Sequence, residues 1–210
     1  MLFRSNITDT PETDIAHAER LVSQALTASP RSPLAHYARG QVLRAQNRWQ
    51  EAIPEYELVL AHDRNWVQAL ANLGECMFYT GLIEEMIPLQ ERAIRLSPRD
   101  PSIVAWYNRI GTVHLLQSRN DEAIIWFEKA RGVNPELPYV HIDLASAYGL
   151  TGLTELAAAA LAEARRLSSD DRYSSIARFK AVEYFGVPKI RALFETTYFA
   201  GLRKAGMPEE

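Results

Sequence analysis

The chain has little of several features that would point to a function: one cysteine, no marked excess of either charge, and no long apolar run. The lone Cys76 excludes an intramolecular disulfide framework, and we expect an inert thiol within a helix. A formal net charge of −3 over 210 residues leaves no basic footprint for nucleic acid. No apolar stretch approaches the roughly 20 residues of a membrane-spanning helix, and the first residues lack a signal-peptide core. We therefore expect a cytoplasmic chain that binds neither nucleic acid nor membrane.

Motifs that carry chemistry are also missing. The sequence contains no GxxxxGK loop, GxGxxG turn, HExxH helix or CxxC pair. Carboxylates such as Glu84 and Glu85 stand where a helix is expected to begin, and negative charge is favourable there without a catalytic role. The histidines are scattered along the chain, and we expect structural roles for His17, His36, His62, His114 and His141. We predict no catalytic residue, no metal and no cofactor, so that this chain is not an enzyme.

Residues recur along the chain in two parallel series, of which the first consists of small residues. The first series, whose members stand at nearly equal intervals, consists of Gly40, Gly74, Gly111 and Ala145. The second series, which follows each member of the first at one constant offset, consists of Ala52, Met86, Ala123 and Ala157. A glycine inside a helix costs about 1 kcal/mol relative to alanine. A regular series of them indicates helix pairs whose backbones cross closely enough for the buried area to offset that cost.

This pattern resembles the tetratricopeptide repeat (TPR), a pair of antiparallel helices, called A and B, with a period of about 34 residues. The third complete unit matches the family motif with Tyr107, Ile110, Gly111, Ala123, Phe127, Ala130 and Pro135. The resemblance implies an all-α fold: a right-handed superhelical solenoid of antiparallel helix pairs with a C-terminal capping helix pair.

The register divides the chain, taken as a single TPR domain over 1–210, into consecutive segments. They are helix B of an incomplete repeat at 10–30, repeats at 33–66, 67–100, 104–137 and 138–171, atypical capping helices at 172–204, and a tail at 205–210.

The N-terminal end departs from the repeat. The helix at 10–30, with Thr10 as its N-cap, has the register of helix B, but too few residues precede it to form a helix A. Either Leu2, Phe3 and Ile7 cover its apolar edge, or the polypeptide is a fragment of a longer protein, and we favour the fragment.

The C-terminal end departs as well. We expect one helix over 172–185 and a final helix that begins at Pro188. The apolar residues expected on one face of the final helix are Ile190, Leu193, Phe194, Tyr198 and Leu202. Such a pair would hide the last apolar face of the stack.

In this family the concave groove is lined by helix A positions 2, 5, 6, 9, 12 and 13. The resemblance therefore implies a partner-binding groove made of Leu34, Tyr37, Gln41, Arg44, Gln68, Asn72, Glu75, Phe78, Tyr79, Asn108, Arg109, Thr112, Leu115, Tyr139, Ile142 and Ser146. This mixture of aromatic rings, amides and few charges suits an extended peptide or a partner helix. Only Asn72 and Arg109 match the five-residue clamp with which some members hold a C-terminal carboxylate, so we do not expect that mode of binding.

The tail YFAGLRKAGMPEE is similar to the C-terminal end of alphaproteobacterial proteins that carry these repeats behind a class III adenylate/guanylate cyclase domain. This second resemblance implies a catalytic domain upstream in a longer protein. Nothing in the 210 residues resembles the cyclase domain itself.

Two hypotheses for the function follow. The leading one is a non-catalytic protein-interaction module, whose groove binds a peptide, a helix or an upstream domain of the same polypeptide, as the regulatory C-terminal part of a bacterial cyclase would. The alternative is a structural scaffold, a homo-oligomer in which the N-terminal half-unit pairs with a second copy.

Overall fold

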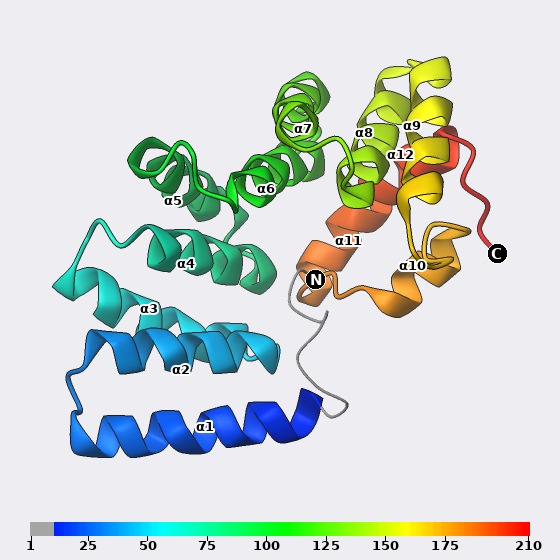
Figure 1. Ribbon diagram of the computed structural model, residues 1–210. Coiled ribbons are helices and arrows are strands. Elements are labelled where there is room, and N and C mark those ends of the chain that lie inside the picture. The colour runs from blue at the N-terminus through cyan, green and yellow to red at the C-terminus, as the bar shows by residue number, and fades with distance from the viewer. Residues whose placement is uncertain (1–10) are drawn as a thin grey trace. The chain divides into compact units, whose positions relative to one another are not determined.

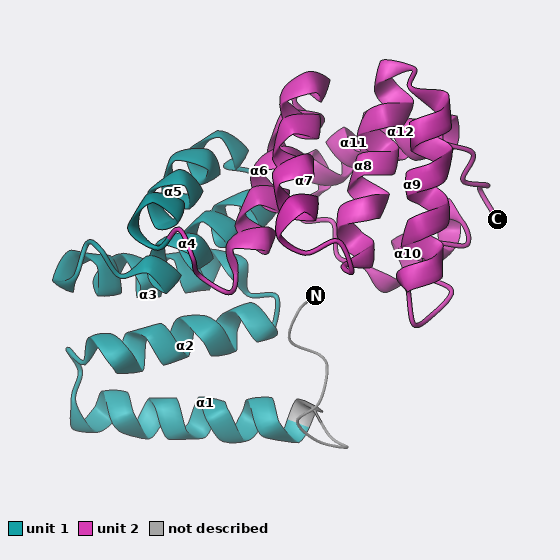
Figure 2. Ribbon diagram, turned by 45° about the horizontal axis from the view of Figure 1, so that its top comes forward, with its two compact units in different colours: residues 1–97 teal, residues 98–210 magenta. Residues whose placement is uncertain are grey.

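The computed structural model describes residues 11–210, and all regular secondary structure in this range is helical (Figure 1). The predicted all-α fold of antiparallel helix pairs is confirmed. The chain divides into two compact units, residues 1–97 and 98–210 (Figure 2).

Unit 1 contains five helices in its described part. They are α1 (Pro11–Ala28), α2 (Pro33–Ala45), α3 (Trp49–His62), α4 (Val67–Thr80) and α5 (Ile83–Leu96). Helix α2 forms a hairpin with α3, and α4 forms one with α5, while α1 packs against α2. Pro11 begins α1, as a residue without a backbone N–H can do at no cost. The expected roles of Thr10, Leu2, Phe3 and Ile7 lie outside the described residues.

Unit 2 contains two further hairpins and a short C-terminal group. The hairpins are α6 (Ile103–Leu116) with α7 (Asn120–Val133), and α8 (Pro138–Thr151) with α9 (Thr154–Leu167). The C-terminal group consists of α10 (Ile176–Val182), α11 (Pro188–Thr196) and α12 (Tyr198–Lys204).

Each hairpin is closed by three residues of its second helix that face the first. All of them are at most 3% exposed, and they are Ala52, Tyr56, Val59, Met86, Gln90, Ala93, Ala123, Phe127, Ala130, Ala157, Leu161 and Ala164. The spacing of these residues is the register that the sequence predicts for helix B.

The glycines inside the first helices make room for a side chain of the second helix. A Cβ placed on Gly40 would lie 2.7 Å from the ring of Tyr56, and one on Gly111 would lie 2.6 Å from the ring of Phe127. At Gly74 the nearest atom to such a Cβ is the amide nitrogen of Gln90, at 3.2 Å. The expectation that backbones touch at these positions is therefore wrong, because a buried side chain fills the space that each glycine leaves.

The C-terminal helices differ from the two that the sequence predicts. The helix expected over 172–185 spans only Ile176–Val182, and it starts where the Ser175 side chain accepts the N–H of Arg178. The helix expected from Pro188 is interrupted at Thr197, so Tyr198 and Leu202 belong to α12. Thr196 and Thr197 both donate their hydroxyls to the carbonyl of Leu193, one turn earlier. Such back-bonding often bends helices, and the break falls at Thr197, whose φ is −119° and ψ −74°.

Replacing Gly111 by alanine should destabilise unit 2, because the new Cβ would stand 2.6 Å from the buried ring of Phe127. Overpacking a tight core costs about 1–3 kcal/mol. Chemical denaturation of the variant and the parent would measure this loss as a difference in the free energy of unfolding.

Gly132 in α7 supplies the matched control, since no heavy atom lies within 4 Å of a Cβ built there. The Gly132→Ala variant should be as stable as the parent or gain up to about 1 kcal/mol from helix propensity. Equal stabilities for the two alanine variants would remove the steric argument.

Candidate functional site

In unit 1 the groove positions of α2 and α4 are joined by a network of polar side chains. Arg44 forms an ion pair with Glu75 and donates hydrogen bonds to the side-chain oxygens of Gln41 (2.7 Å) and Asn72 (2.8 Å). The Asn72 amide in turn donates to the hydroxyl of Tyr37 (3.2 Å) and to Gln41 (3.0 Å). These contacts fix the spacing of two helices that belong to successive hairpins.

Aromatic rings pack beside this network. The Tyr37 ring stacks on Trp66, with centroids 5.4 Å apart, and meets Tyr56 edge-on at 5.9 Å. The Tyr56 hydroxyl donates to the side-chain oxygen of Gln41 at 2.6 Å. Burial raises the pKa of both tyrosines, so both hydroxyls stay protonated at physiological pH.

The charges of the network are largely buried and neutralise each other. The side chains of Arg44 and Glu75 are only 15% and 12% exposed. Because Arg44 and Glu75 pair with each other, neither gains as much from binding an external charge as an unpaired charge would. The pairing does hold their polar atoms in fixed positions. We define the unit 1 surface as Leu34, Tyr37, Gln41, Arg44, Gln68, Asn72 and Glu75.

The sixteen residues expected in the groove fall into distinct environments. The five that form the network are Tyr37, Gln41, Arg44, Asn72 and Glu75. The two that are exposed, both in the first turn of a helix, are Leu34 and Gln68. Those of intermediate exposure outside the network are Tyr79, Asn108, Arg109 and Tyr139. Those that are buried are Phe78, Thr112, Leu115, Ile142 and Ser146.

In unit 2 the groove face of α8 is covered by the chain's own helix α12. Ser146 is fully buried, and its hydroxyl donates to the carbonyl of Tyr198 at 2.7 Å. The helices approach so closely that a Cβ on Gly149 would lie 2.2 Å from the carbonyl oxygen of Gly201. This is a backbone contact of the kind expected for the repeat glycines, at a different pair of residues.

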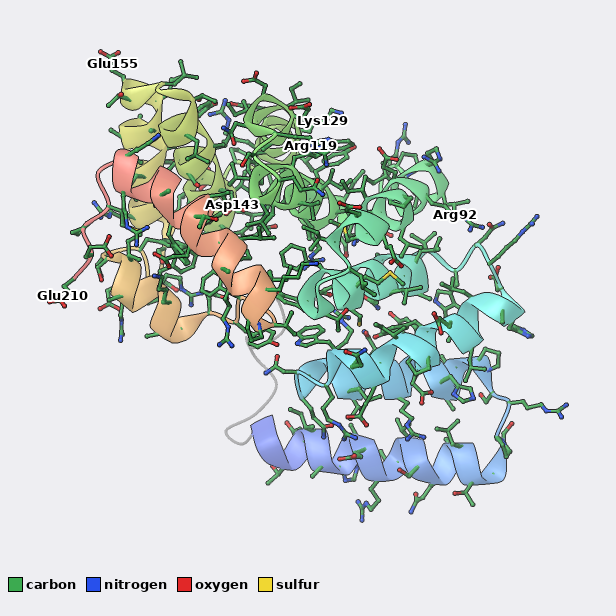
Figure 3. The ribbon with its side chains drawn as sticks, turned by 180° about the vertical axis from the view of Figure 1, so that it is seen from behind. Arg92, Arg119, Lys129, Asp143, Glu155 and Glu210 are labelled. Atoms are coloured by element: carbon green, nitrogen blue, oxygen red, sulfur yellow. The ribbon has the colours of Figure 1, made fainter. Side chains whose placement is uncertain are left out.

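A buried carboxylate lies at the same contact. Asp143, on α8 beside the C-terminal helices (Figure 3), is 6% exposed and accepts hydrogen bonds from the Asn108 amide (2.6 Å) and the Tyr198 hydroxyl. Burial raises the pKa of Asp143 to about 7, repulsion from Glu183 adds to the rise, and the two hydrogen bonds oppose it. Burial also raises the pKa of Tyr139 and of Tyr173, and the charge of Asp143 adds to the rise in both.

Sequence reasoning missed Asp143 and Gly149, although both occupy groove positions of the fourth repeat. Their signal is present in the chain: Ser146 and Gly149 form a stripe of small residues on one face, and Gly201 and Ala205 form another. Two such stripes allow two helices to approach closely. Their pairing is a tertiary contact between segments far apart in sequence, which no local pattern reveals.

Two histidines have the structural roles that the sequence predicts. His36 donates its Nε2 proton to the carbonyl of Pro30 (3.0 Å), and His141 donates in the same way to Pro135 (2.6 Å). Each bond ties the first helix of a hairpin to the segment before it. Among the described residues, no group of three or more His, Cys, Asp or Glu is placed to hold a metal ion. In the same part of the chain, no helix has both the length and the apolar character needed to cross a membrane.

Antiparallel helix pairs in sequence order, with a small residue opposite a buried side chain, define an α-helical repeat protein. Family models described as tetratricopeptide repeat match residues 13–69 and 66–136, which together make up more than half of the chain. The chain belongs to the tetratricopeptide repeat family.

Solved structures of this fold are similar to the chain over most of its length. MamA is 22% identical with a TM-score of 0.65, and the alignment covers 74% of this chain and 89% of MamA. Pseudomonas aeruginosa PilF is 20% identical with a TM-score of 0.68, covering 91% and 84%. YrrB, described as a TPR protein with an unusual peptide-binding site, is 12% identical with a TM-score of 0.60, covering 89% and 98%. No curated protein sequence matches the chain.

Raising the pH from 5 to 8 should destabilise the chain through Asp143. Its pKa is about 7 in the folded state against an ordinary value of 3.8, so the folded state holds the extra proton between these values. The stabilising effect of that proton is present at low pH and is lost as the pH rises through about 7. Urea denaturation at both pH values should show a loss of about 2–3 kcal/mol from this group.

The Asp143→Asn variant isolates the contribution of this carboxyl group to the pH dependence of stability, because asparagine has nearly the same shape as aspartate and does not titrate. The free energy of unfolding should depend less on pH in this variant than in the parent, and the variant should be the more stable of the two at pH 8. Parallel pH profiles for variant and parent would contradict the assignment.

Proposed function

We propose that this chain is a non-catalytic protein-interaction module whose unit 1 surface binds an extended peptide or a helix of a partner. The observation that carries the proposal is the polar network of Arg44, Glu75, Asn72 and Gln41, which is assembled before any partner arrives. Preorganised polar groups bind without the entropy cost of ordering flexible side chains.

An apolar contact point accompanies the network. Leu34 is 67% exposed in the first turn of α2, and Gln68 is exposed in the first turn of α4. Leu34 precedes Tyr37 by about one helical turn and Gln41 by about two, which places all three on one face of the helix. An exposed leucine beside ordered polar atoms suits a partner with an apolar side chain next to backbone amides.

YrrB, a similar fold, is described as having a peptide-binding site, which supports a peptide as the class of partner. Because YrrB is only 12% identical to the chain, it shows a shared fold and does not indicate which residues bind a peptide. The binding residues are therefore proposed from this chain alone.

A random peptide library displayed on phage tests the proposal. Peptides selected on the full chain should bind the Leu34→Ser variant at least fivefold more weakly, since the exposed apolar contact is lost. Leu58 on α3 is 51% exposed and supplies the matched control, so Leu58→Ser should bind as the parent does. Selected peptides that bind all three proteins equally would refute the unit 1 surface.

A more specific hypothesis, that the partner segment belongs to a cyclase, rests on the similarity of the C-terminal tail to the corresponding end of cyclase-family proteins. Under it, the partner segment belongs to a catalytic domain upstream in the same polypeptide, and docking on the unit 1 surface changes the activity of that domain. The family matches and the similar structures concern the repeats, and the link to a cyclase stays a prediction.

A second candidate, the oligomeric scaffold, is favoured by one observation on α1. In this helix Ala18 and Val22 are half-buried and Ala25 is exposed, whereas the corresponding residues of α3, such as Ala52, are fully buried. Among the described residues this face of α1 is less covered than that of α3, and pairing with a second copy would bury it.

Light scattering across a range of concentrations tests this candidate. A dimer built on α1 should dissociate in the Ala25→Glu variant, which places a charge on the uncovered face. It should persist in the Ala16→Glu variant, whose change lies on the same helix at an exposed position outside that face. A parent chain that stays monomeric at every concentration would exclude the scaffold.

A further inference from the structure

One side of helix α9 has no helix packed along it in the described part of the chain. In α7 the ninth residue, Glu128, accepts the Tyr148 hydroxyl of α8, so this position faces the next hairpin. One turn earlier on the same face, Ile124 is partly buried. The corresponding residues of α9 are Ala158 and Ala162, and both are exposed. The side that a further hairpin would cover is therefore open on α9.

The C-terminal helices do not close this side. Helix α12 packs chiefly against α8 and only marginally against α9, and α10 and α11 pack against α9 even less. The expected capping helices therefore cover α8, the first helix of the last hairpin, and leave α9 exposed to a partner.

The open side of α9 has one unpaired charge of each sign, at opposite ends. Glu155, in the first turn, is exposed, points away from the rest of unit 2 (Figure 3) and has no ion pair among the described residues. In the last turn, Arg165 donates to the backbone carbonyls of Tyr173 (2.9 Å) and of the next residue (3.1 Å). In the described part of the chain no carboxylate neutralises this guanidinium, whereas Glu163 and Arg166 pair with each other at 2.7 Å.

This face of α9 is complementary to itself when it is turned end to end. Glu155, Ala158, Ala162 and Arg165 follow one another at intervals of three and four residues, so they lie on one face of the helix. Glu155 and Arg165 are equally far from Ala160 along the helix, and so are the two exposed alanines. An identical helix running in the opposite direction would therefore place a guanidinium opposite each carboxylate.

We infer that α9 pairs antiparallel with α9 of a second copy of this chain, through the face of Glu155, Ala158, Ala162 and Arg165. In this dimer, Glu155 of each copy forms an ion pair with Arg165 of the other. The alanines meet at the centre, where small side chains let the helix axes approach to the short end of the usual 8–10 Å. The inference goes beyond the proposed function, since it concerns a surface of unit 2 and a helix other than α1.

Charge complementarity selects this occupant over two others. Helix α1 of another copy has no basic residue in its last turn, so an antiparallel α1 would leave Glu155 unpaired. A parallel α9 would place each Glu155 beside the other and each Arg165 beside the other, and like charges repel. Of the three arrangements, the antiparallel α9 pair alone neutralises both charges.

The size of the face predicts a weak dimer. The fourteen residues of α9 give a helix about 21 Å long. One pair of such helices buries less than the roughly 1,600 Å² of a standard interface. Ion pairs at a solvent-exposed edge also weaken as salt is added. Association should therefore depend on both protein concentration and ionic strength.

Sedimentation equilibrium of the full chain at low salt is the first test. The parent should dimerise, and Glu155→Arg should weaken the dimer about fivefold or more, because two ion pairs become two repulsions. Arg165→Glu should weaken it similarly. An equimolar mixture of the two variants should dimerise at least as well as the parent, since unlike charges then face each other at both ends. A parent that stays monomeric, or a mixture that associates no better than its components, would overturn the inference.

Cysteine crosslinking keeps the test decisive if Arg165→Glu fails to fold. Ala158 and Ala162 are exposed, so a cysteine at either position disturbs no packing, and the native Cys76 is buried. Under a mild oxidant, an Ala158→Cys chain should form a disulfide with an Ala162→Cys chain faster than either forms one with itself. Gly132→Cys, at an open position of α7, is the matched control and should link to neither. Equal rates for all pairs would contradict the antiparallel α9 dimer.

The tests of the other surfaces fail independently of this one. Ala25→Glu, which would break a dimer built on α1, should leave the α9 dimer intact. Leu34→Ser, which tests the unit 1 surface, should dimerise as the parent does. A dimer that is lost in Ala25→Glu and kept in Glu155→Arg would assign the contact to α1 and overturn the inference.

Discussion

The fold depends on one packing constraint: the first helix of a hairpin leaves a space at its midpoint, and a side chain of the second helix fills it. The rings of Tyr56 and Phe127 occupy the spaces opposite Gly40 and Gly111, and neither ring is exposed at all. A large buried ring stabilises by its area, and a helical glycine costs only about 1 kcal/mol. The pair is therefore favourable as a unit and unfavourable when either member changes alone.

This constraint explains why the repeats could be predicted from sequence. A small residue and the side chain that fills its space lie within one hairpin, as Gly40 of α2 and Tyr56 of α3 do. Local contacts of this kind recur with the period of the chain, and the period is visible without coordinates. Which atoms the glycine contacts was less predictable. The spacing alone does not show whether a glycine lies against an aromatic ring or against the backbone of another helix.

The contact between α8 and α12 could not be predicted from the sequence, for a related reason. Gly149 and Gly201 meet although α9, α10 and α11 lie between them along the chain, and no period links them. The groove residues likewise follow from the family pattern. That pattern gives the helix face on which they lie, but it does not show which other part of the chain covers this face. The Asn72 amide donates a hydrogen bond to Gln41, and the Ser146 hydroxyl donates one to a backbone carbonyl of α12. Each of these pairings depends on the full set of tertiary neighbours.

The two groove faces meet the same physical requirement in different ways. Polar atoms at a half-buried surface need partners, since leaving one unpaired costs about 1–3 kcal/mol. In unit 1 the side chains of neighbouring helices supply most of these partners, although Arg44 Nε has none, and the face stays accessible at Leu34. In unit 2 Asp143 and Ser146 take part of their hydrogen bonding from α12, so this face is complete only with a helix upon it. The first face therefore keeps an accessible apolar side chain, whereas the second is already covered by a helix of the same chain.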